Sequence, residues 1–139
     1  MKFEELLLSQ LLLVKNKRTA TVDLRGVVFE EVGPLFNAFY SEHLPFDLTG
    51  AQKRVLREVR TDMRHGRHMN RLLQGDVGSG KTIVAMLSAL LAVDNGYQVC
   101  IMAPTEILAQ QHFATFGEML IELDVEVGLL TGSTKNQDR

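Results

Sequence analysis

The stretch that decides the fold is Gly75-Asp76-Val77-Gly78-Ser79-Gly80-Lys81-Thr82, which matches G-x-x-x-x-G-K-[S/T] at every fixed position. Its glycines let backbone N–H groups turn toward an anion, and the helix that follows adds the positive end of its dipole. In this pattern Lys81 reaches the β- and γ-phosphates of a nucleotide, and the Thr82 hydroxyl ligates Mg²⁺. The sequence therefore predicts a phosphate-binding loop. A glycine-rich turn without a ligand is the alternative.

The segments around this loop alternate between strand-like and helix-like patterns. Three short segments are expected as strands: residues 70–74, which contain Leu72 and Leu73, the continuous apolar run 98–103, and residues 125–130. Between them, residues 81–93 are apolar on nearly every side, and residues 109–120 carry apolar side chains at helical spacing. Asn95-Gly96 supplies a stop signal after the first of these helices. This order predicts an α/β fold, a partial P-loop domain with a parallel sheet flanked by helices.

The N-terminal third has a different pattern. A Leu-rich amphipathic helix is expected at residues 3–14 and a short helix at 34–41, followed by the break Leu44-Pro45-Phe46-Asp47-Leu48. We therefore expect a helical segment over residues 1–44 and the P-loop domain over 45–139. Thr49-Gly50-Ala51-Gln52 fits a capping box for a helix that runs to about Gly66. Its expected apolar face contains Ala51, Val55, Val59 and Met63.

Composition and charge exclude several classes of protein. The net charge of −2 excludes a uniformly basic nucleic-acid coat, and a single cysteine, Cys100, excludes a disulfide framework and fits the cytoplasm. The apolar run Leu6 to Val14 is too short to span a membrane, and Glu4 and Glu5 argue against a signal peptide. Residues 43–81 carry eight basic and four acidic side chains. Such a stripe could attract phosphates, although a solvated helix face is the alternative.

Three motifs together resemble superfamily 2 DNA helicases, and most closely the RecG family. They are Leu44-Pro45-Phe46 with Leu48-Thr49-Gly50-Ala51-Gln52, then Gln74-Gly75-Asp76-Val77-Gly78-Ser79-Gly80-Lys81-Thr82, then Met102-Ala103-Pro104-Thr105-Glu106. The resemblance runs from about residue 44 to 139. It implies a RecA-like ATP-binding domain of an ATP-dependent helicase that remodels stalled forks and branched recombination intermediates. The transcription-repair coupling helicases, which have a similar loop, are the alternative; Ser79 favours RecG.

The resemblance assigns roles to these motifs. Phe46 would stack on the adenine of ATP and Gln52 would pair with its edge. Lys81 would be the catalytic lysine, with Mg²⁺ on Thr82. The third motif, Pro104-Thr105-Glu106, would grip the backbone of a DNA strand, and Thr131-Gly132-Ser133 lies where a further DNA-contacting loop can occur. Each role has a structural alternative: Gln52 as the capping partner of Thr49, Phe46 as a hydrophobic staple, and Thr105 as a helix cap.

A working motor of this class also needs a second lobe with arginine fingers and an acidic pair that orients water. The nearest acidic cluster, Glu122-Leu123-Asp124, follows a helix and is rejected. We therefore expect a fragment that binds nucleotide at most and does not hydrolyse it. A truncated regulator and a small P-loop kinase are the other classes, and the kinase lacks lid-like arginines. Branched DNA is the partner implied for the parent protein, no membrane is implied, and exposed sheet edges predict self-association.

Overall fold

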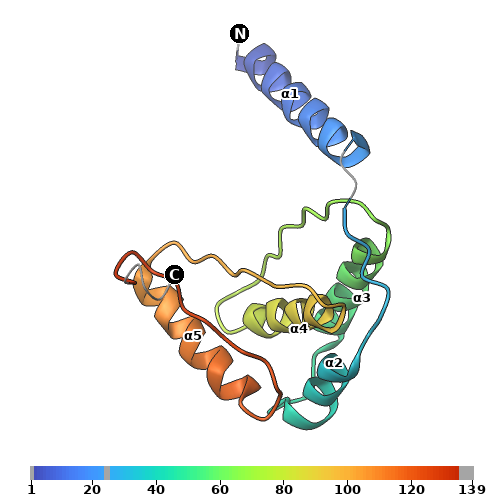
Figure 1. Cartoon of the computed structure of the whole chain (residues 1–139). Helices are drawn as coiled ribbons and strands as arrows, with labels where there is room; N and C mark the ends of the chain where they lie inside the picture. The colour runs from blue at the N-terminus through green and yellow to red at the C-terminus, as the bar shows by residue number, and fades with distance from the viewer. Residues whose placement is uncertain (1, 24–25, 135–139) are drawn as a thin grey trace. The chain divides into compact units, whose positions relative to one another are not determined.

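The computed structural model describes residues 2–23 and 26–134 of the chain. The backbone divides into two compact units, the first made of residues 1–30 and 49–81 and the second of residues 31–48 and 82–139. The domain boundary expected between residues 44 and 45 stays a prediction. The elements follow in the order α1 (Lys2–Asp23), α2 (Pro34–Ala38), the π-helical turn η1 (Phe39–His43), α3 (Gly50–Arg64), α4 (Lys81–Asp94) and α5 (Glu106–Leu120), as Figure 1 shows.

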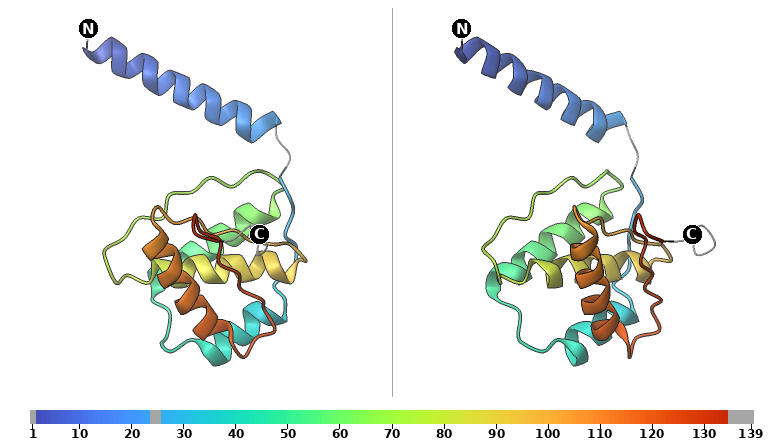
Figure 2. Two further views of the ribbon diagram at one scale, coloured as in Figure 1. Left: turned by 60° about the vertical axis from the view of Figure 1, so that its left-hand side comes forward. Right: turned by 90° about the vertical axis from the view of Figure 1, so that its left-hand side faces the viewer.

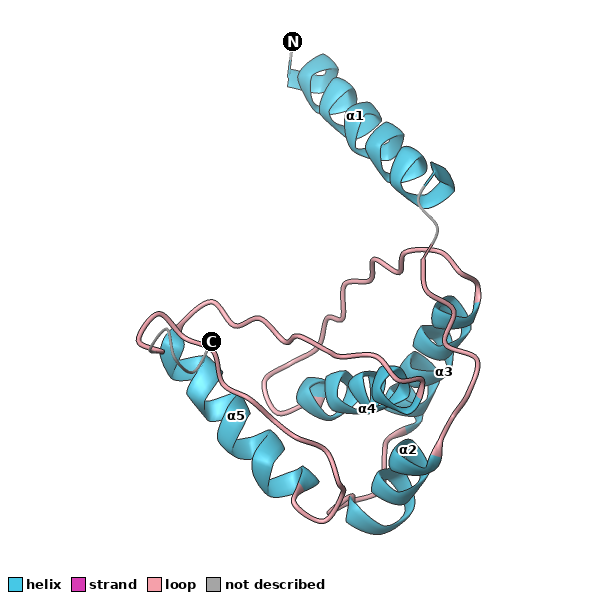
Figure 3. Cartoon of the chain, in the orientation of Figure 1, coloured by secondary structure: helices cyan, strands magenta, loops and turns pink. Residues whose placement is uncertain are grey.

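The prediction of a parallel sheet is wrong for this structure. Within residues 2–23 and 26–134 no strand is formed, and the segments 70–74, 98–103 and 125–130 run as open chain (Figure 3). A helix makes its backbone hydrogen bonds four residues away along the same segment, whereas a strand needs a neighbouring strand. Residues 98–103 and 125–130 are rich in apolar side chains, as strands are, but none of the three segments has a ladder partner in the described chain. Self-association of the chain stays a prediction.

In the first unit, α3 begins at the predicted cap. Thr49 Oγ1 accepts a hydrogen bond from the Gln52 backbone N–H at 3.3 Å, and Gln52 Oε1 accepts one from the Thr49 N–H at 2.8 Å. The capping box is thus confirmed. The helix ends at Arg64, close to the predicted stop, and Gly66 follows with a φ of +62°.

The buried stripe of α3 differs from the expected one. Ala51 is exposed and Val55 half-buried, while the positions that follow them are buried. The buried residues are Gln52, Leu56, Val59 and Met63. Apolar spacing alone does not indicate Gln52, because a polar side chain is rarely part of a buried stripe.

Helix α1 is longer than the segment 3–14 expected from the sequence. The side chains of residues 3–16 are exposed, the leucines among them included. The amphipathic helix that we predicted therefore buries none of these side chains. Among the residues that the structure describes, no helix has the length and apolar character needed to cross a membrane.

In the second unit, α4 is largely buried, as its apolar pattern predicts. The buried residues are Ile83, Val84, Met86, Leu87, Leu90, Leu91 and Ala92. The helix ends at Asp94, and Gly96 has a φ of +79°, so the stop signal Asn95-Gly96 is confirmed. Burial of this helix supplies most of the apolar packing in the second unit.

The C-terminal end of α4 holds the segment that enters α2. The Asp94 carboxylate accepts hydrogen bonds from the backbone N–H groups of Leu35 at 3.0 Å and Phe36 at 2.9 Å. Next to it, the Asn95 side chain accepts from Glu31 N at 3.2 Å and donates to Glu31 O at 3.0 Å. A carboxylate at a helix C-terminus opposes the dipole of its own helix. Asp94 is instead placed to cap the N-terminus of α2.

Helix α5 lies later in the same unit and buries Phe116 and Leu120 of its predicted apolar face. After it the chain turns and runs back beside the helix, as Figures 1 and 2 show. At the end of this return the Ser133 hydroxyl donates a hydrogen bond to the Glu106 carboxylate in the first turn of α5. The return segment thus brings residues 131–134 to the N-terminus of the helix.

Candidate functional site

The loop between residues 75 and 81 lies in the first unit and makes a tight turn. Ser79 N donates to Asp76 O at 3.2 Å, and Gly78 and Gly80 have φ angles of +79° and +76°. Such angles are costly for residues other than glycine. At Gly80 a Cβ atom would also collide with the side-chain amide of Gln52. The backbone therefore favours glycine at positions 78 and 80, and at Gly80 a neighbouring side chain does so as well.

The Lys81 ammonium group is turned into this loop. Its Nζ atom donates to Asp76 O at 2.7 Å and to Gly75 O at 2.9 Å, and it lies 3.5 Å from Ser79 Oγ. The backbone carbonyl groups of the loop thereby hold a cation inside the turn. A phosphate that entered the loop would meet this charge without a long movement of the side chain. The predicted role of Lys81 fits this geometry.

Gln52 links the start of α3 to the loop. Its side chain is 9% exposed, its Oε1 accepts from Thr49 N, and its Nε2 donates to Ser79 O at 2.9 Å. The capping interpretation of Gln52 is confirmed. The amide also holds the loop, which the sequence analysis did not predict. Pairing with an adenine, which nothing in this structure tests, would require the amide to exchange one of these bonds.

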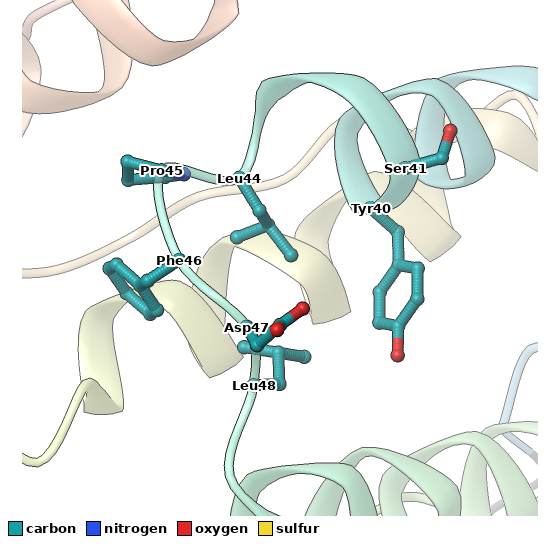
Figure 4. A pocket seen from close by; sticks show the side chains of 7 residues that line it. All are labelled: Tyr40, Ser41, Leu44, Pro45, Phe46, Asp47 and Leu48. Atoms are coloured by element: carbon teal, nitrogen blue, oxygen red, sulfur yellow. The ribbon is translucent and has the colours of Figure 1, made fainter.

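Phe46 lies in the second unit, on the extended segment after η1. Figure 4 shows its ring on one side of the backbone and the Asp47 carboxylate on the other, beside a hollow of about 320 Å³. The ring is 47% exposed, whereas Leu48, which directly precedes the cap residue Thr49, is 5% exposed. The staple alternative given for Phe46 has no apolar partner at the fourth helical position, because Lys53 stands there. The exposed face of Phe46 is free to stack on a planar ring.

Thr82 begins the second unit in the first turn of α4. It is half-buried, and its hydroxyl has no hydrogen bond within residues 2–23 and 26–134. A hydroxyl oxygen beside a phosphate loop fits Mg²⁺, a hard cation that takes oxygen ligands. No group of three or more His, Cys, Asp or Glu in the described chain could hold a metal. A magnesium ion here would therefore depend on phosphate oxygens as well as on Thr82.

The third motif, also in the second unit, precedes α5. Thr105 has an extended backbone, and its Oγ1 accepts a hydrogen bond from Leu108 N at 3.3 Å, which confirms the capping alternative. Glu106 accepts from Ser133, whose hydroxyl also lies 2.8 Å from Thr131 Oγ1. The structure thus brings the weakly indicated loop 131–133 to the third motif. Chain spacing alone could not predict this contact.

The motifs are shared with known proteins. Residues 49–139 match the family model of the DEAD/DEAH box helicases. Two similar proteins are named ATP-dependent DNA helicase RecG. The one from Aquifex aeolicus is 50% identical over 94% of this chain and 16% of its own length, and the one from Pasteurella multocida is 47% identical over 99% and 20%. The resemblance to RecG is thus confirmed.

A solved structure, described as RecG bound to a three-way DNA junction, matches with a TM-score of 0.87 at 42% identity. The match covers 98% of this chain and 18% of the other. The backbone therefore follows the course of that part of the neighbour. The chain spans a fifth or less of the length of these proteins.

Proposed function

The chain belongs to the DEAD/DEAH box helicase family, and on that premise we propose that it is the nucleotide-binding part of an ATP-dependent DNA helicase. The observation that carries the proposal is the loop 75–81, in which Lys81 is held by the loop's own carbonyl groups. A glycine-rich turn that only joined two segments would need neither a buried amide on its backbone nor a lysine directed into it.

Within the loop, the backbone N–H groups from Gly75 to Gly80 and the Lys81 ammonium would hold the β- and γ-phosphates of ATP. The Thr82 hydroxyl would ligate Mg²⁺, which when bound offsets the negative charge of the phosphates. Lys81 acts on the reacting γ-phosphate and is the proposed catalytic residue. Lys81 is the first residue of α4, so the N-terminus of this helix adds the favourable end of its dipole.

For the base, we assign stacking to Phe46 and edge recognition to Gln52. Phe46 supports this role through its exposed ring, and Gln52 through an amide that already lies on the loop. Gln52 Nε2 donates to Ser79 O, so the same side chain would recognise the base and hold the loop in place. Guanine presents different donors and acceptors at its edge, so this arrangement favours adenine.

For DNA, we assign contact with a strand backbone to Pro104, Thr105 and Glu106. The capped N-terminus of α5 offers N–H groups to a phosphate, and the hydroxyl groups of residues 131–133 lie beside it. For the whole protein we propose action on forked or branched DNA in repair and recombination. The support is the RecG name of its relatives and the three-way junction of the structural neighbour.

For the 139-residue chain by itself, we propose nucleotide binding without turnover. Activation of water would need an acidic side chain at the site. Glu122, in the acidic cluster 122–124, instead pairs with His43 at 3.2 Å within the second unit. A cytoplasmic location is part of the proposal, because a DNA helicase works where the chromosome lies and the single cysteine fits a reducing compartment.

The test is a titration of a fluorescent adenine nucleotide with Mg²⁺ into the chain and two variants. Saturable binding is expected for the wild type and for Lys15→Ala, which removes an equal charge from the exposed face of α1. Lys81→Ala should weaken binding by about 10- to 100-fold, the worth of a charged hydrogen bond. ATP should compete better than GTP. Equal binding by Lys81→Ala and wild type would refute the proposal.

A further inference from the structure

Helix α3 carries a second ordered row of side chains, beside its buried stripe. Lys53, Arg57, Arg60 and Arg64 occur at positions i, i+4, i+7 and i+11, and all four are exposed. Each directly follows a buried residue, so the row lies about 100° around the helix from the buried stripe. It extends for about 16 Å along the helix axis. We call this row the basic stripe.

The carboxylates of α3 do not neutralise the basic stripe, because Arg71 binds both of them. Its Nη1 donates to Glu58 Oε2 at 2.7 Å, and its Nε donates to the Asp62 carboxylate. Arg71 comes from the segment after the helix. Within residues 2–23 and 26–134, the four residues of the basic stripe make no ion pair. The stripe therefore presents four uncompensated positive charges in a chain whose net charge is −2.

The surface of the stripe is shaped as well as charged. Three of its arginines line a shallow hollow of about 510 Å³ with Thr61 and His65. The Thr61 hydroxyl donates to Arg57 O at 2.8 Å, and His65 Nδ1 is hydrogen-bonded to Thr61 O, so both side chains are held against the helix backbone. The lining has no large apolar side chain. Protein interfaces are centred on apolar anchors, which this surface lacks, whereas phosphate contacts need only charge and donors.

We propose that the basic stripe of α3 binds the phosphate backbone of DNA without sequence preference. Four basic residues that follow one another at intervals of about 4.5 to 6 Å along the helix axis match a repeated anion better than a single ligand. Arginine donates to phosphate oxygens through a planar pair of N–H groups, which favours phosphate over a diffuse counterion. The inference rests on the proposed function for the class of partner, and it adds a DNA contact separate from residues 104–106.

The test measures binding of labelled duplex and single-stranded DNA to the full chain over a range of salt concentrations. Lys53→Gln with Arg60→Gln removes two charges from the stripe, and Lys15→Gln with Arg67→Gln removes one lysine and one arginine elsewhere. The stripe variant should bind about tenfold more weakly at low salt, with a slope of log K against log salt reduced by about 2 on duplex DNA. A greater effect on the duplex or on the single strand identifies the form that is bound.

Two outcomes would overturn the inference: equal weakening by both double variants, or no DNA binding by the wild-type chain at low salt. The nucleotide titration separates this failure from that of the proposed function. Lys81→Ala should weaken nucleotide binding and keep the stripe-dependent DNA binding, whereas the stripe variant should weaken DNA binding and keep nucleotide binding. Circular dichroism of all variants should show the same helix content.

Discussion

Two regions of the chain differ in their backbone hydrogen bonds. The first is the loop 75–81 with α3, and the second consists of the open segments 98–103 and 125–130. The first region closes its bonds within itself, through a capping box, a four-residue turn and a lysine that donates to the carbonyl groups of its own loop. The open segments are as apolar as α4, yet no ladder joins them to another segment of the described chain. Apolar composition therefore does not by itself produce a strand.

The two regions differ in how far apart in the sequence their hydrogen-bond partners lie. A cap or a turn needs partners three or four residues away, and these partners are present in any sequence that encodes them. A strand needs a second extended segment at its side with the correct register.

Amide hydrogen exchange tests the comparison directly. The backbone amides of α4 are bonded within a buried helix, and those of residues 98–103 are in open chain. We expect exchange in 98–103 to be about 100-fold faster or more, because opening a buried helix requires a larger unfolding event. Mass spectrometry of peptides from both regions measures the difference, with α5 as an internal reference. Equal protection of the two regions would contradict the open-chain description.

Substitution at Gly80 should distort the loop 75–81 and weaken nucleotide binding. Alanine there would have to adopt a positive φ, at a cost of about 1–2 kcal/mol, and would also collide with Gln52. Gly78→Ala is the matched control, because Gly78 has a similar φ but open space around its Cβ position. We expect Gly80→Ala to weaken nucleotide binding about tenfold more than Gly78→Ala does. If the two variants bind alike, contact with Gln52 does not shape the loop.

Asp94→Ala tests a cap in the second unit whose partners are distant in the sequence. The variant removes the carboxylate that accepts from Leu35 N and Phe36 N. Loss of a capping side chain should cost about 1–2 kcal/mol in the free energy of unfolding. Denaturant titration measures it. Asp124→Ala removes an exposed carboxylate from the same unit and should cost less than about 0.5 kcal/mol. If both variants lower the free energy of unfolding by a similar amount, Asp94 does not cap α2.

The smallest expected effect concerns the ion pair at the end of α3. The hydrogen bond from Arg71 holds the pKa of Asp62 below its ordinary value. Because the pKa is lower in the folded state, this contribution to stability is present above the unfolded pKa and is lost as pH falls through the folded one. Arg71→Gln should raise the pKa of Asp62 toward its ordinary value, as followed by nuclear magnetic resonance, and Arg67→Gln should leave it unchanged.

The parts of the fold that sequence patterns could predict are those with local causes. Thr49 and Gln52 stand three residues apart and form the predicted capping box, and the apolar pattern of α4 ends at the predicted Asn95-Gly96. The loop motif likewise contains its own turn residues. In each case the interacting groups are near neighbours in the chain, so spacing and residue type are sufficient.

The parts that could not be predicted depend on distant partners. The bond of Gln52 to Ser79 spans 27 residues, and that of Asp94 to Leu35 spans 59. No periodicity in the sequence encodes such pairs. The same reason explains the wrong prediction of a sheet: the apolar runs were identified correctly, but whether they pair depends on the lateral position of other segments. The adenine and DNA roles of Phe46, Gln52 and residues 104–106 stay predictions.

The position of α4 has a mechanical consequence. Its first residue is Lys81 and its last is Asp94, so one rigid rod of about 20 Å begins at the phosphate loop and ends at the bonds that hold residues 31–36. Such a rod behaves as a lever. A pivot of about 5° at the lysine end would displace the Asp94 end by about 2 Å, because displacement equals the length of the rod multiplied by the angle. Within the second unit, a tilt of α4 would therefore displace residues 31–36 through the bonds of Asp94 and Asn95.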